Sequence, residues 1–320
     1  MDPYGTEKKV IFVGGTSFSG STLLHFMLAN DRAGIAVGEI RWLFYPAACY
    51  HINRPCACGD KECRFYEALY KEGARRVFLA IFERYPEVQF IVDSSKHPYW
   101  IHSQANILRQ QQISVTNALI WKNPWDFYRS MQKRGRSKQW AQRWVHYHRL
   151  YFSLFKDFYA LSYAKLATSP QALQKLCAHA GVPYYPEKRE FWRRKTHAFG
   201  GNRTARYHFL NQPEAERVLS ETHDPNRMDR YRSVRYAETI TNEVREIVDR
   251  AFRETRYMRE IYEDLQRLES RPSGERTMMT PLYGPAMLLL FKTKYRIKTK
   301  IYSPYVRCRC SIRSKEMKEV

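Results

Sequence analysis

A short apolar run followed at once by a loop of small residues constrains the fold more than any other feature of this sequence. Val10 to Val13 is apolar and β-rich, and residues 15–22 after it are mostly glycine, serine and threonine. The next residues, Leu23 to Leu28, are apolar at helical spacing. The order strand, loop, helix indicates an α/β protein in which the loop can bind an anion at the helix N-terminus.

The loop has the frame of a Walker A motif, GxxxxG followed by two residues of which the second carries a hydroxyl. Its members are Gly15, Thr16, Ser17, Phe18, Ser19, Gly20, Ser21 and Thr22. Ser21 stands where a nucleoside triphosphatase has the lysine that reaches the β- and γ-phosphates. The remaining backbone N–H groups and hydroxyls suit a smaller anion, such as a 5′-phosphate or a phosphosulfate. A strand-to-helix turn of small packing residues is the alternative interpretation.

Strands and helices continue to alternate along the chain. Further apolar runs predict strands at Gln89 to Val92, Val115 to Trp121 and Tyr159 to Tyr163. Helices are expected from Pro124, over 138–158, from Ser169 to Gly181 and over 239–263. This alternation predicts an α/β fold with a mostly parallel sheet. We expect one domain at residues 1–268 and a basic C-terminal tail at residues 269–320.

The charge of the chain bears on its partners. Lys and Arg number 54 against 32 Asp and Glu, which gives a formal charge of +22. This surplus favours anionic partners, such as nucleotides, acidic glycans, phospholipid head groups or nucleic acid, without choosing among them. The apolar run near the N-terminus is too short for a signal peptide or a membrane span. We therefore expect a cytoplasmic protein, and the basic-flanked run MLLLF in the tail leaves peripheral contact with the inner membrane surface open.

The loop and four later segments resemble the sulfotransferase superfamily. The family's 5′-phosphosulfate loop commonly reads RSGTTLL or RSGSTLL, and residues 18–24 read FSGSTLL. The segments GE, DSSK, KNP with a downstream serine, and GGN follow in the family's order. The resemblance implies one α/β domain with a central parallel sheet of about five strands flanked by helices, as in P-loop nucleotide kinases. Phe18 stands where the family usually has Arg or Lys, so this cation either comes from elsewhere, with Lys96 and the stretch near Arg203 as candidates, or is absent.

The resemblance also implies a second anion site, for a 3′-phosphate. Lys122, at the end of a predicted strand, and Ser130 match the family's strand-then-RDP segment and its downstream serine. Lys122 replaces the usual arginine, which keeps the charge and loses the bidentate fork. A solvated lysine at a strand end is the alternative.

Two segments are expected to carry the chemistry. Glu39 follows a glycine, as in the GE that supplies the catalytic base in several carbohydrate and tyrosylprotein sulfotransferases. Such a carboxylate contacts the acceptor hydroxyl and removes its proton. Lys96 ends a predicted strand, where open α/β sheets bind ligands, and would neutralise charge on the departing 5′-phosphate. The neighbours expected to bind substrate are Ser94, Ser95 and His97. An ordinary capped turn is the alternative.

A late segment resembles the family's H-x-x-x-GNP, which closes over the nucleotide. It begins at His197, and Asn202 and Arg203 are the residues expected to reach the donor. Arg203 replaces the family's proline, so a flexible basic turn is the alternative.

A group of cysteines invites a metal assignment. Cys56, Cys58 and Cys63 have the spacing C-x-C-x4-C, with Cys49 and His51 just upstream. This spacing matches the CxxC pairs of zinc sites poorly, so we expect no metal. A local disulfide or a loop without chemistry, as in similar inserts of bacterial sulfotransferases, is the preferred interpretation.

The implied activity is transfer of a sulfuryl group from 3′-phosphoadenosine 5′-phosphosulfate to an acceptor hydroxyl, which leaves 3′-phosphoadenosine 5′-phosphate. The acceptor class is a carbohydrate, a lipid or a small metabolite, and no nucleic-acid partner is expected. A P-loop kinase or nucleoside triphosphatase is the first alternative, and the missing loop lysine argues against it. A non-enzymatic protein that binds polyanions or a membrane surface is the second.

Overall fold

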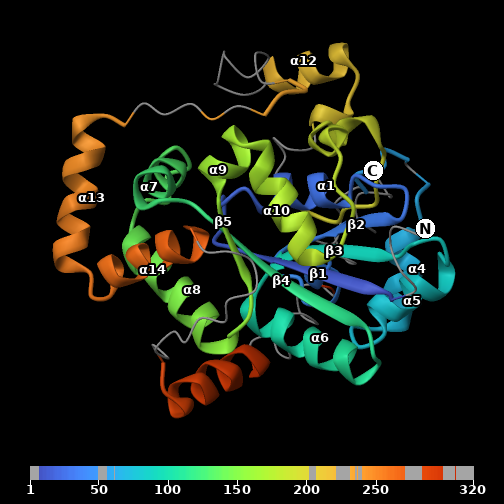
Figure 1. Ribbon diagram of the computed structural model, residues 1–320, viewed down its shortest axis with the longest axis horizontal. Helices are drawn as coiled ribbons and strands as arrows, with labels where there is room; N and C mark the ends of the chain where they lie inside the picture. Colours follow the sequence, from blue (N-terminus) through green and yellow to red (C-terminus); the bar gives the residue numbers. More distant parts are fainter. Residues whose placement is uncertain are drawn as a thin grey trace, which may run out of the picture.

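Five parallel strands lie at the centre of the described part of the molecule (Figure 1). The computed structural model describes residues 7–49, 56–60, 62–201, 207–220, 231–234, 236, 240–270, 283–297 and 307. The strands are β1 (Lys9–Gly14), β2 (Gly34–Gly38), β3 (Phe90–Lys96), β4 (Ser114–Trp121) and β5 (Tyr159–Ser162). They lie in the order β2-β3-β1-β4-β5, and every neighbouring pair is parallel. The predicted α/β fold with a central parallel sheet is confirmed.

Helices cover both faces of this sheet (Figure 1). The described helices are α1 (Ser21–Ala29), α2 (Arg41–Phe44), α4 (Phe65–Glu72), α5 (Val77–Arg84), α6 (Pro98–Gln110), α7 (Pro124–Gln132), α8 (Trp140–Leu154), α9 (Tyr163–Thr168), α10 (Pro170–Ala180), α12 (Gln212–Ser220), α13 (Asn242–Glu254) and α14 (Met258–Ser270). Short 3₁₀ turns lie at Pro186–Arg189, Phe191–Arg193 and Tyr207–Phe209. Helices α1, α9 and α10 pack on one face, and α5, α6 and α8 pack on the other.

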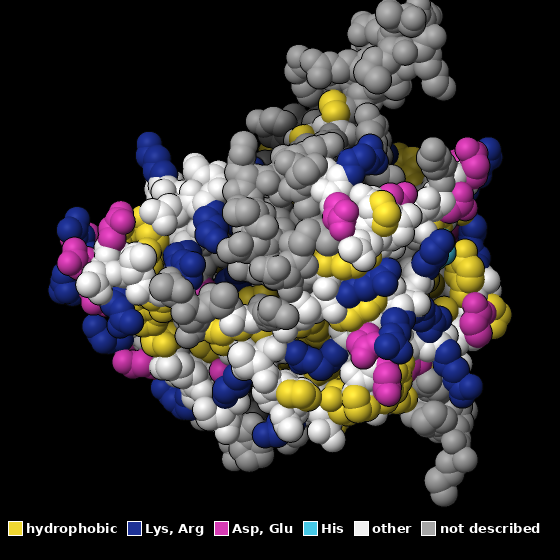
Figure 2. Space-filling view, turned by 90° about the horizontal axis from the view of Figure 1, so that it is seen from above, with side chains coloured by type: hydrophobic (Ala, Val, Ile, Leu, Met, Phe, Trp, Pro, Cys, Tyr) yellow, Lys and Arg dark blue, Asp and Glu magenta, His cyan; other side chains and the backbone are white. Residues whose placement is uncertain are grey.

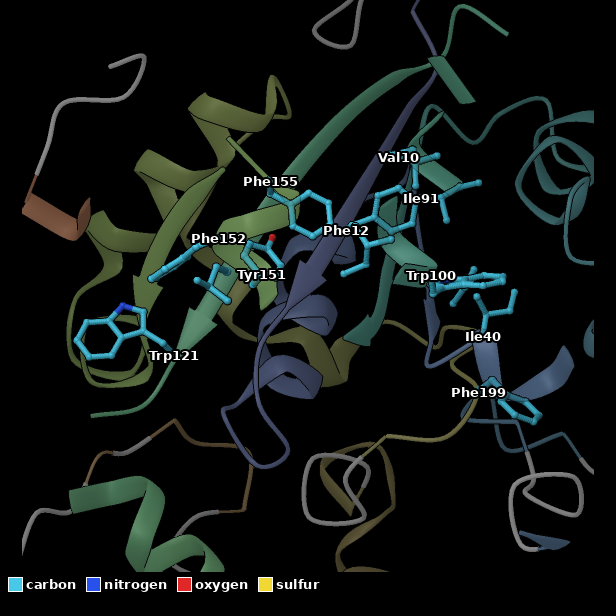
Figure 3. Packing of buried hydrophobic residues seen from close by; sticks show 14 of the residues in the cluster. Val10, Phe12, Ile40, Ile91, Trp100, Trp121, Tyr151, Phe152, Phe155 and Phe199 are labelled. Carbon is cyan, nitrogen blue, oxygen red and sulfur yellow. The ribbon is translucent and has the colours of Figure 1, made fainter. Parts of the chain in front are cut away.

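The central strand is apolar on both sides because helices cover both faces. In β1, Val10 and Phe12 belong to the cluster under α5, α6 and α8, while Ile11 and Val13 belong to the cluster under α1 and α10. All four side chains are fully buried. Figure 3 shows Phe12 beside Phe155, the residue that follows α8. A continuous apolar run is what a parallel strand buried on two faces requires, and here it leads directly into the glycine loop.

One strand of the sheet has no clear signal in the sequence. The three strands predicted after β1 are present with shifted ends, but β2 holds only five residues, GIAVG. Ile35 and Ala36 of β2 pair with Ile91 and Val92 of β3. This strand is therefore defined by its partner, because three apolar residues between glycines are too short a pattern to identify it alone.

The chain continues as packed structure beyond the predicted domain boundary. Helix α14 ends at residue 270 and buries three apolar side chains, so a boundary after residue 268 falls inside it. A further helix over 285–297, red in Figure 1, lies beside α6 and α8. The Tyr99 hydroxyl of α6 donates to the Leu288 carbonyl at 3.1 Å. The division into a domain and a basic tail stays a prediction, with part of the tail packed on the domain.

Among the described helices, none combines the length and the hydrophobicity that crossing a bilayer requires.

Candidate functional site

The carboxyl ends of four neighbouring strands bring the predicted residues to one edge of the sheet. Along this edge the order is Lys122 after β4, the loop of residues 15–20 after β1, Lys96 at the end of β3, and Glu39 after β2. Neighbouring strands are about 4.8 Å apart, so these groups lie in adjacent positions. Open α/β sheets bind their ligands in the crevice outside this edge.

The loop presents buried hydroxyls to the start of α1. Thr16 is 5% exposed and Ser19 is 0% exposed, and neither hydroxyl has a hydrogen-bond partner within the described residues. Gly20 caps α1 without a side-chain hydrogen bond. The first N–H groups of a helix have no intrahelical partner and carry the positive end of its dipole. Unpaired buried hydroxyls beside such N–H groups fit an oxyanion ligand.

Two loop glycines occupy positions that no other residue fits. Gly15 has φ 148° and Gly20 has φ 100°. A Cβ on Gly15 would overlap the Ile120 carbonyl oxygen, and a Cβ on Gly20 would overlap the ring of Tyr163. Both glycines are therefore needed for the loop to lie against β4 and the start of α9.

The two residues predicted for a 3′-phosphate are in contact. The Lys122 ammonium donates to the Ser130 hydroxyl at 3.0 Å and lies 4.6 Å from the ring centroid of Tyr163. Burial lowers the pKa of Lys122 to about 8, Asp126 opposes this, and Arg134 and neighbouring cations add to it. Because Tyr163 also packs on Gly20, one ring joins the two candidate anion sites.

An arginine that the sequence analysis did not identify reaches both candidate sites. The Arg134 guanidinium lies 4.1 Å from the ring centroid of Phe18 and donates to the Ser130 carbonyl at 2.7 Å. Phe18 itself has φ 68°, a conformation that costs a non-glycine residue energy. Phe18 therefore holds a cation beside the loop through its ring, at the place where the resemblance implied a loop cation. No local signal in the basic stretch KRGR distinguishes this arginine.

The two residues predicted to be catalytic form an ion pair. The Lys96 ammonium contacts the Glu39 carboxylate, with side chains 15% and 18% exposed. The other carboxylate oxygen of Glu39 accepts from the Trp42 indole N–H at 2.8 Å. Lys96 has φ 64°, so β3 ends in a strained residue. The pair is oriented and partly open to solvent, as a proton acceptor and a cation near a reacting group would have to be.

A buried tyrosine of α8 connects the loop to this pair. The Gly15 N–H donates to the Tyr147 hydroxyl at 2.6 Å, and that hydroxyl donates to the Lys96 carbonyl at 2.7 Å. Burial raises the pKa of Tyr147 well above its ordinary value, so it acts as a neutral hydrogen-bonding group. Tyr147 was not among the predicted site residues, because an aromatic residue on an aromatic-rich helix is typical of packing.

The serines predicted to bind substrate have internal partners. The Ser94 hydroxyl and His25 Nδ1 are 2.8 Å apart, and both residues are fully buried. The Ser95 hydroxyl donates to Asp93 at 2.5 Å and accepts from the Arg41 N–H at 3.1 Å. Burial raises the pKa of Asp93 to about 6, and the bonds from Ser95 oppose this. Acceptor binding by these serines stays a prediction, and their burial favours a supporting role instead.

The end of the edge nearest Glu39 carries aromatic and basic groups. His97 caps α6 and stacks on Tyr295 with ring centroids 4.4 Å apart. The Arg41 guanidinium donates to the Tyr295 hydroxyl at 3.1 Å. Tyr295 of the predicted tail thus lies beside His97, a predicted substrate-binding residue. It also contacts Arg41, which is two positions after Glu39 in the chain.

The described part of the late segment, which begins at His197, approaches the start of α1. A Cβ built on Gly201 would lie 3.0 Å from a side-chain carbon of Thr22. The predicted donor-binding residues Asn202 and Arg203 lie outside the described residues. The described end of this segment therefore lies close to the start of α1, and contact of the segment with the donor stays a prediction.

The cysteines converge with a residue from this late segment. Cys56, Cys58 and Cys63 are free thiols, so the expected local disulfide is not formed among them. Their sulfur atoms and a nitrogen of His197 all lie within 4.8 Å of one another. His197 is 134 residues beyond Cys63, so the spacing of the cysteines alone did not point to it.

Basic side chains are spread over the face shown in Figure 2, with acidic side chains between them. Nucleic-acid-binding domains usually gather their cations in a patch or stripe on one face. The described part of this face does not show such a stripe, so it gives no support to that alternative.

Solved structures that are similar to this chain include two sulfotransferase domains. The sulfotransferase domain from the curacin biosynthetic pathway is 17% identical with a TM-score of 0.43, and the match covers 76% of this chain and 97% of that one. The sulfotransferase domain from the Synechococcus PCC 7002 olefin synthase is 16% identical with a TM-score of 0.41, over 76% of this chain and 94% of that one. No protein-family model and no curated protein matches the chain. Similarities this low do not establish a family or an activity for this chain.

Proposed function

We propose that this protein is a sulfotransferase that moves a sulfuryl group from 3′-phosphoadenosine 5′-phosphosulfate to an acceptor hydroxyl. The order of groups along the carboxyl edge carries the proposal. From β4 to β2 it runs Lys122, phosphate loop, Lys96 and Glu39. In this order, Lys122 would bind the 3′-phosphate and the N–H groups of the loop would bind the 5′-phosphosulfate. Lys96 would contact the leaving oxygen, and Glu39 would take the acceptor's proton.

The loop and the Lys122 pair fit the two anionic ends of this donor. The 5′ end would accept from the N–H groups at the start of α1 and from the unpartnered hydroxyls of Thr16 and Ser19. The 3′-phosphate would accept from Lys122 and Ser130, with Arg134 adding charge. A nucleotide without a 3′-phosphate would leave the Lys122 site unused.

The Glu39 and Lys96 pair supplies the acid–base groups of the transfer. The donor, when bound, supplies an activated sulfuryl group. The acceptor oxygen forms a bond to sulfur while the bond from sulfur to the 5′-phosphate oxygen breaks, and the acceptor's proton passes to Glu39. Lys96 neutralises the charge that the leaving phosphate gains. The observed ion pair keeps both groups at adjacent strand ends, ready for these two roles.

We further propose that the acceptor carries a hydroxyl and is a carbohydrate, a lipid or a small metabolite. His97, Tyr295 and Arg41 form an aromatic and basic wall beside Glu39. Aromatic walls with a few polar groups are common in sites for such ligands. A P-loop kinase is the weaker candidate, because Ser21 occupies the position of the phosphate-binding lysine.

Calorimetric titration with adenosine 3′,5′-bisphosphate, AMP and ATP tests the donor site, with and without Mg²⁺. We expect the bisphosphate to bind without Mg²⁺ and about 10- to 100-fold more tightly than AMP, since charge-assisted hydrogen bonds contribute about 1.5–3 kcal/mol. Lys122→Met should lower the affinity for the bisphosphate to about the affinity for AMP. Lys133→Met, which removes an exposed charge of the same region, should change the affinity little. A preference for ATP with Mg²⁺ would favour the kinase alternative. If none of the three nucleotides binds, the proposed function is contradicted.

A further inference from the structure

Four potential metal ligands that the proposed reaction does not use converge beside β2. Cys56, Cys58 and Cys63 lie on the segment before α4, and His197 lies on the segment that pairs with β2. One ligand atom from each residue lies within 4.8 Å of the other three. The three thiols are free and partly buried. The three cysteines come from one short segment, and His197 meets them from 134 residues beyond Cys63.

The spacing fits a tetrahedral metal centre. The sulfur atoms of Cys56 and Cys63 lie 3.4 Å and 3.5 Å from Nδ1 of His197. With Zn–S at about 2.3 Å and Zn–N at about 2.0–2.1 Å, a tetrahedral zinc ion places sulfur and nitrogen about 3.5 Å apart and two sulfurs about 3.8 Å apart. The two observed distances therefore match the separation of sulfur and nitrogen ligands around one tetrahedral ion.

Backbone groups already orient the sulfur atoms. The N–H of Cys58 donates to the sulfur of Cys56, and the N–H of Phe65 donates to the sulfur of Cys63. Each donor lies two residues after its cysteine, and the Gly59 N–H closes a turn onto the Cys56 carbonyl at 3.4 Å. Donors of this kind stabilise thiolate sulfur and fix its direction, as outer-shell hydrogen bonds do at metal sites.

The histidine is fixed from both sides. Its ring stacks on Phe65 with centroids 4.3 Å apart and planes 7° from parallel. The Tyr66 hydroxyl donates to the carbonyl of His197. Ring stacking and the backbone bond together keep Nδ1 directed at the three sulfurs.

We propose that Cys56, Cys58, Cys63 and His197 bind one Zn²⁺ ion in a closed structural site. Three sulfurs and one imidazole nitrogen form the ligand set that zinc takes at structural sites. Protein ligands fill all four positions, which leaves no open position for water or substrate. Binding releases the thiol protons and leaves three thiolates around the ion.

The metal would anchor the segment that follows His197. Two residues on, the Phe199 carbonyl accepts from the Glu39 N–H at 2.6 Å, and Phe199 pairs with the end of β2. Gly201 then lies against Thr22 of α1. A zinc ion at His197 thus fixes the backbone beside both the loop and Glu39, and its effect on catalysis rests on the proposed function.

Metal analysis of protein purified without a polyhistidine tag and without chelators tests the site directly. We expect stoichiometric zinc in the wild-type chain and in Cys177→Ala, whose buried cysteine lies in α10 away from this group. Zinc should be lost from Cys58→Ser and from His197→Gln. Removal of zinc by a strong chelator under reducing conditions should lower the Tm, and added Zn²⁺ should restore it.

Cobalt provides a readout that does not depend on the variants folding. Metal-free wild-type protein titrated with Co²⁺ should develop thiolate-to-cobalt charge-transfer bands and the visible bands of a tetrahedral ion, saturating at one equivalent. Zinc-free protein that gains no such bands and no stability from Zn²⁺ would overturn the proposal. So would a disulfide between two of these cysteines, found by mass spectrometry of unreduced peptides. These readouts need no sulfotransferase assay, so their failure is distinct from failure of the proposed activity.

Discussion

At the scale of single residues, the lysine at the end of β4 differs from an arginine in more than shape. Its ammonium is held by Ser130 and lies over Tyr163. Burial lowers the pKa of Lys122 to about 8, whereas an arginine at this position would stay charged through the range of any assay. The charge of this candidate anion site therefore depends on pH near neutrality.

Affinity for adenosine 3′,5′-bisphosphate should fall as the pH rises above 8. The lowered pKa means that Lys122 loses its proton above about pH 8 and with it the attraction for the 3′-phosphate. The phosphate has its second pKa at about 6, so it stays doubly charged over this range. Calorimetry between pH 7 and pH 9.5 should show affinity falling by up to about tenfold per pH unit above pH 8. Lys122→Arg should flatten this dependence, and an equally steep decline in that variant would contradict the assignment.

Glu39→Gln should abolish most of the turnover and leave nucleotide binding intact. The amide keeps the size of the side chain but cannot take the acceptor's proton, and general bases contribute about 10²- to 10⁴-fold to rate. The measurement is kcat on an identified acceptor together with bisphosphate affinity. Glu87→Gln, an exposed carboxylate outside the edge, is the matched control. Full turnover in Glu39→Gln would mean that another group is the base.

At the scale of elements, the loop between β1 and α1 depends on its glycines and on neighbours from distant helices. Gly20 packs against Tyr163 at the start of α9, and the Gly15 N–H is bound by Tyr147 of α8. The loop is thus shaped from both faces of the sheet. These contacts hold the backbone that carries the two buried hydroxyls.

Gly20→Ala should weaken bisphosphate binding by about tenfold, since overpacking costs about 1–3 kcal/mol and the loop must shift away from Tyr163. Gly73→Ala is the matched control, because Gly73 also has a positive φ, 79°, but faces open space. The control should lower stability slightly and leave affinity unchanged. Equal affinity in both variants would show that the loop does not hold the anion. Thermal unfolding of each variant separates loss of binding from loss of fold.

At the scale of the whole molecule, a segment near the C-terminus packs against residues that neighbour Glu39 and Lys96 in the chain. The helix over 285–297 places Tyr295 against His97 and Arg41. The same helix exposes apolar side chains, with Leu289 65% and Leu290 47% exposed. Peripheral membrane contact through this basic, partly apolar segment stays a prediction.

Tyr295→Ala should raise the KM for the acceptor severalfold and leave bisphosphate affinity unchanged. The substitution removes the ring that stacks on His97 and the hydroxyl that accepts from Arg41, but it touches neither candidate anion site. Leu289→Ala, on the exposed side of the same helix, controls for a general effect on the segment. An unchanged KM in Tyr295→Ala would place the acceptor elsewhere.

The sequence by itself determined the parts of this protein that depend on local patterns. Continuous apolar runs identified the strands buried on two faces, and their alternation with helices predicted the parallel sheet. The glycine and hydroxyl loop predicted an anion site because the N-terminus of the following helix is fixed by chain continuity. Lys122 and Ser130 are only eight residues apart, across a strand end and one helix, so their pairing could be predicted from the sequence.

Only the tertiary structure decided which distant side chains meet. Glu39 and Lys96 are 57 residues apart, and they pair because β2, which the sequence did not reveal, lies beside β3. Cys63 meets His197 across 134 residues, so cysteine spacing alone argued against a metal. Arg134 lies over the ring of Phe18 because the chain just after α7 packs beside the loop. Such contacts arise from strand order and helix packing, which neither residue spacing nor composition encodes locally.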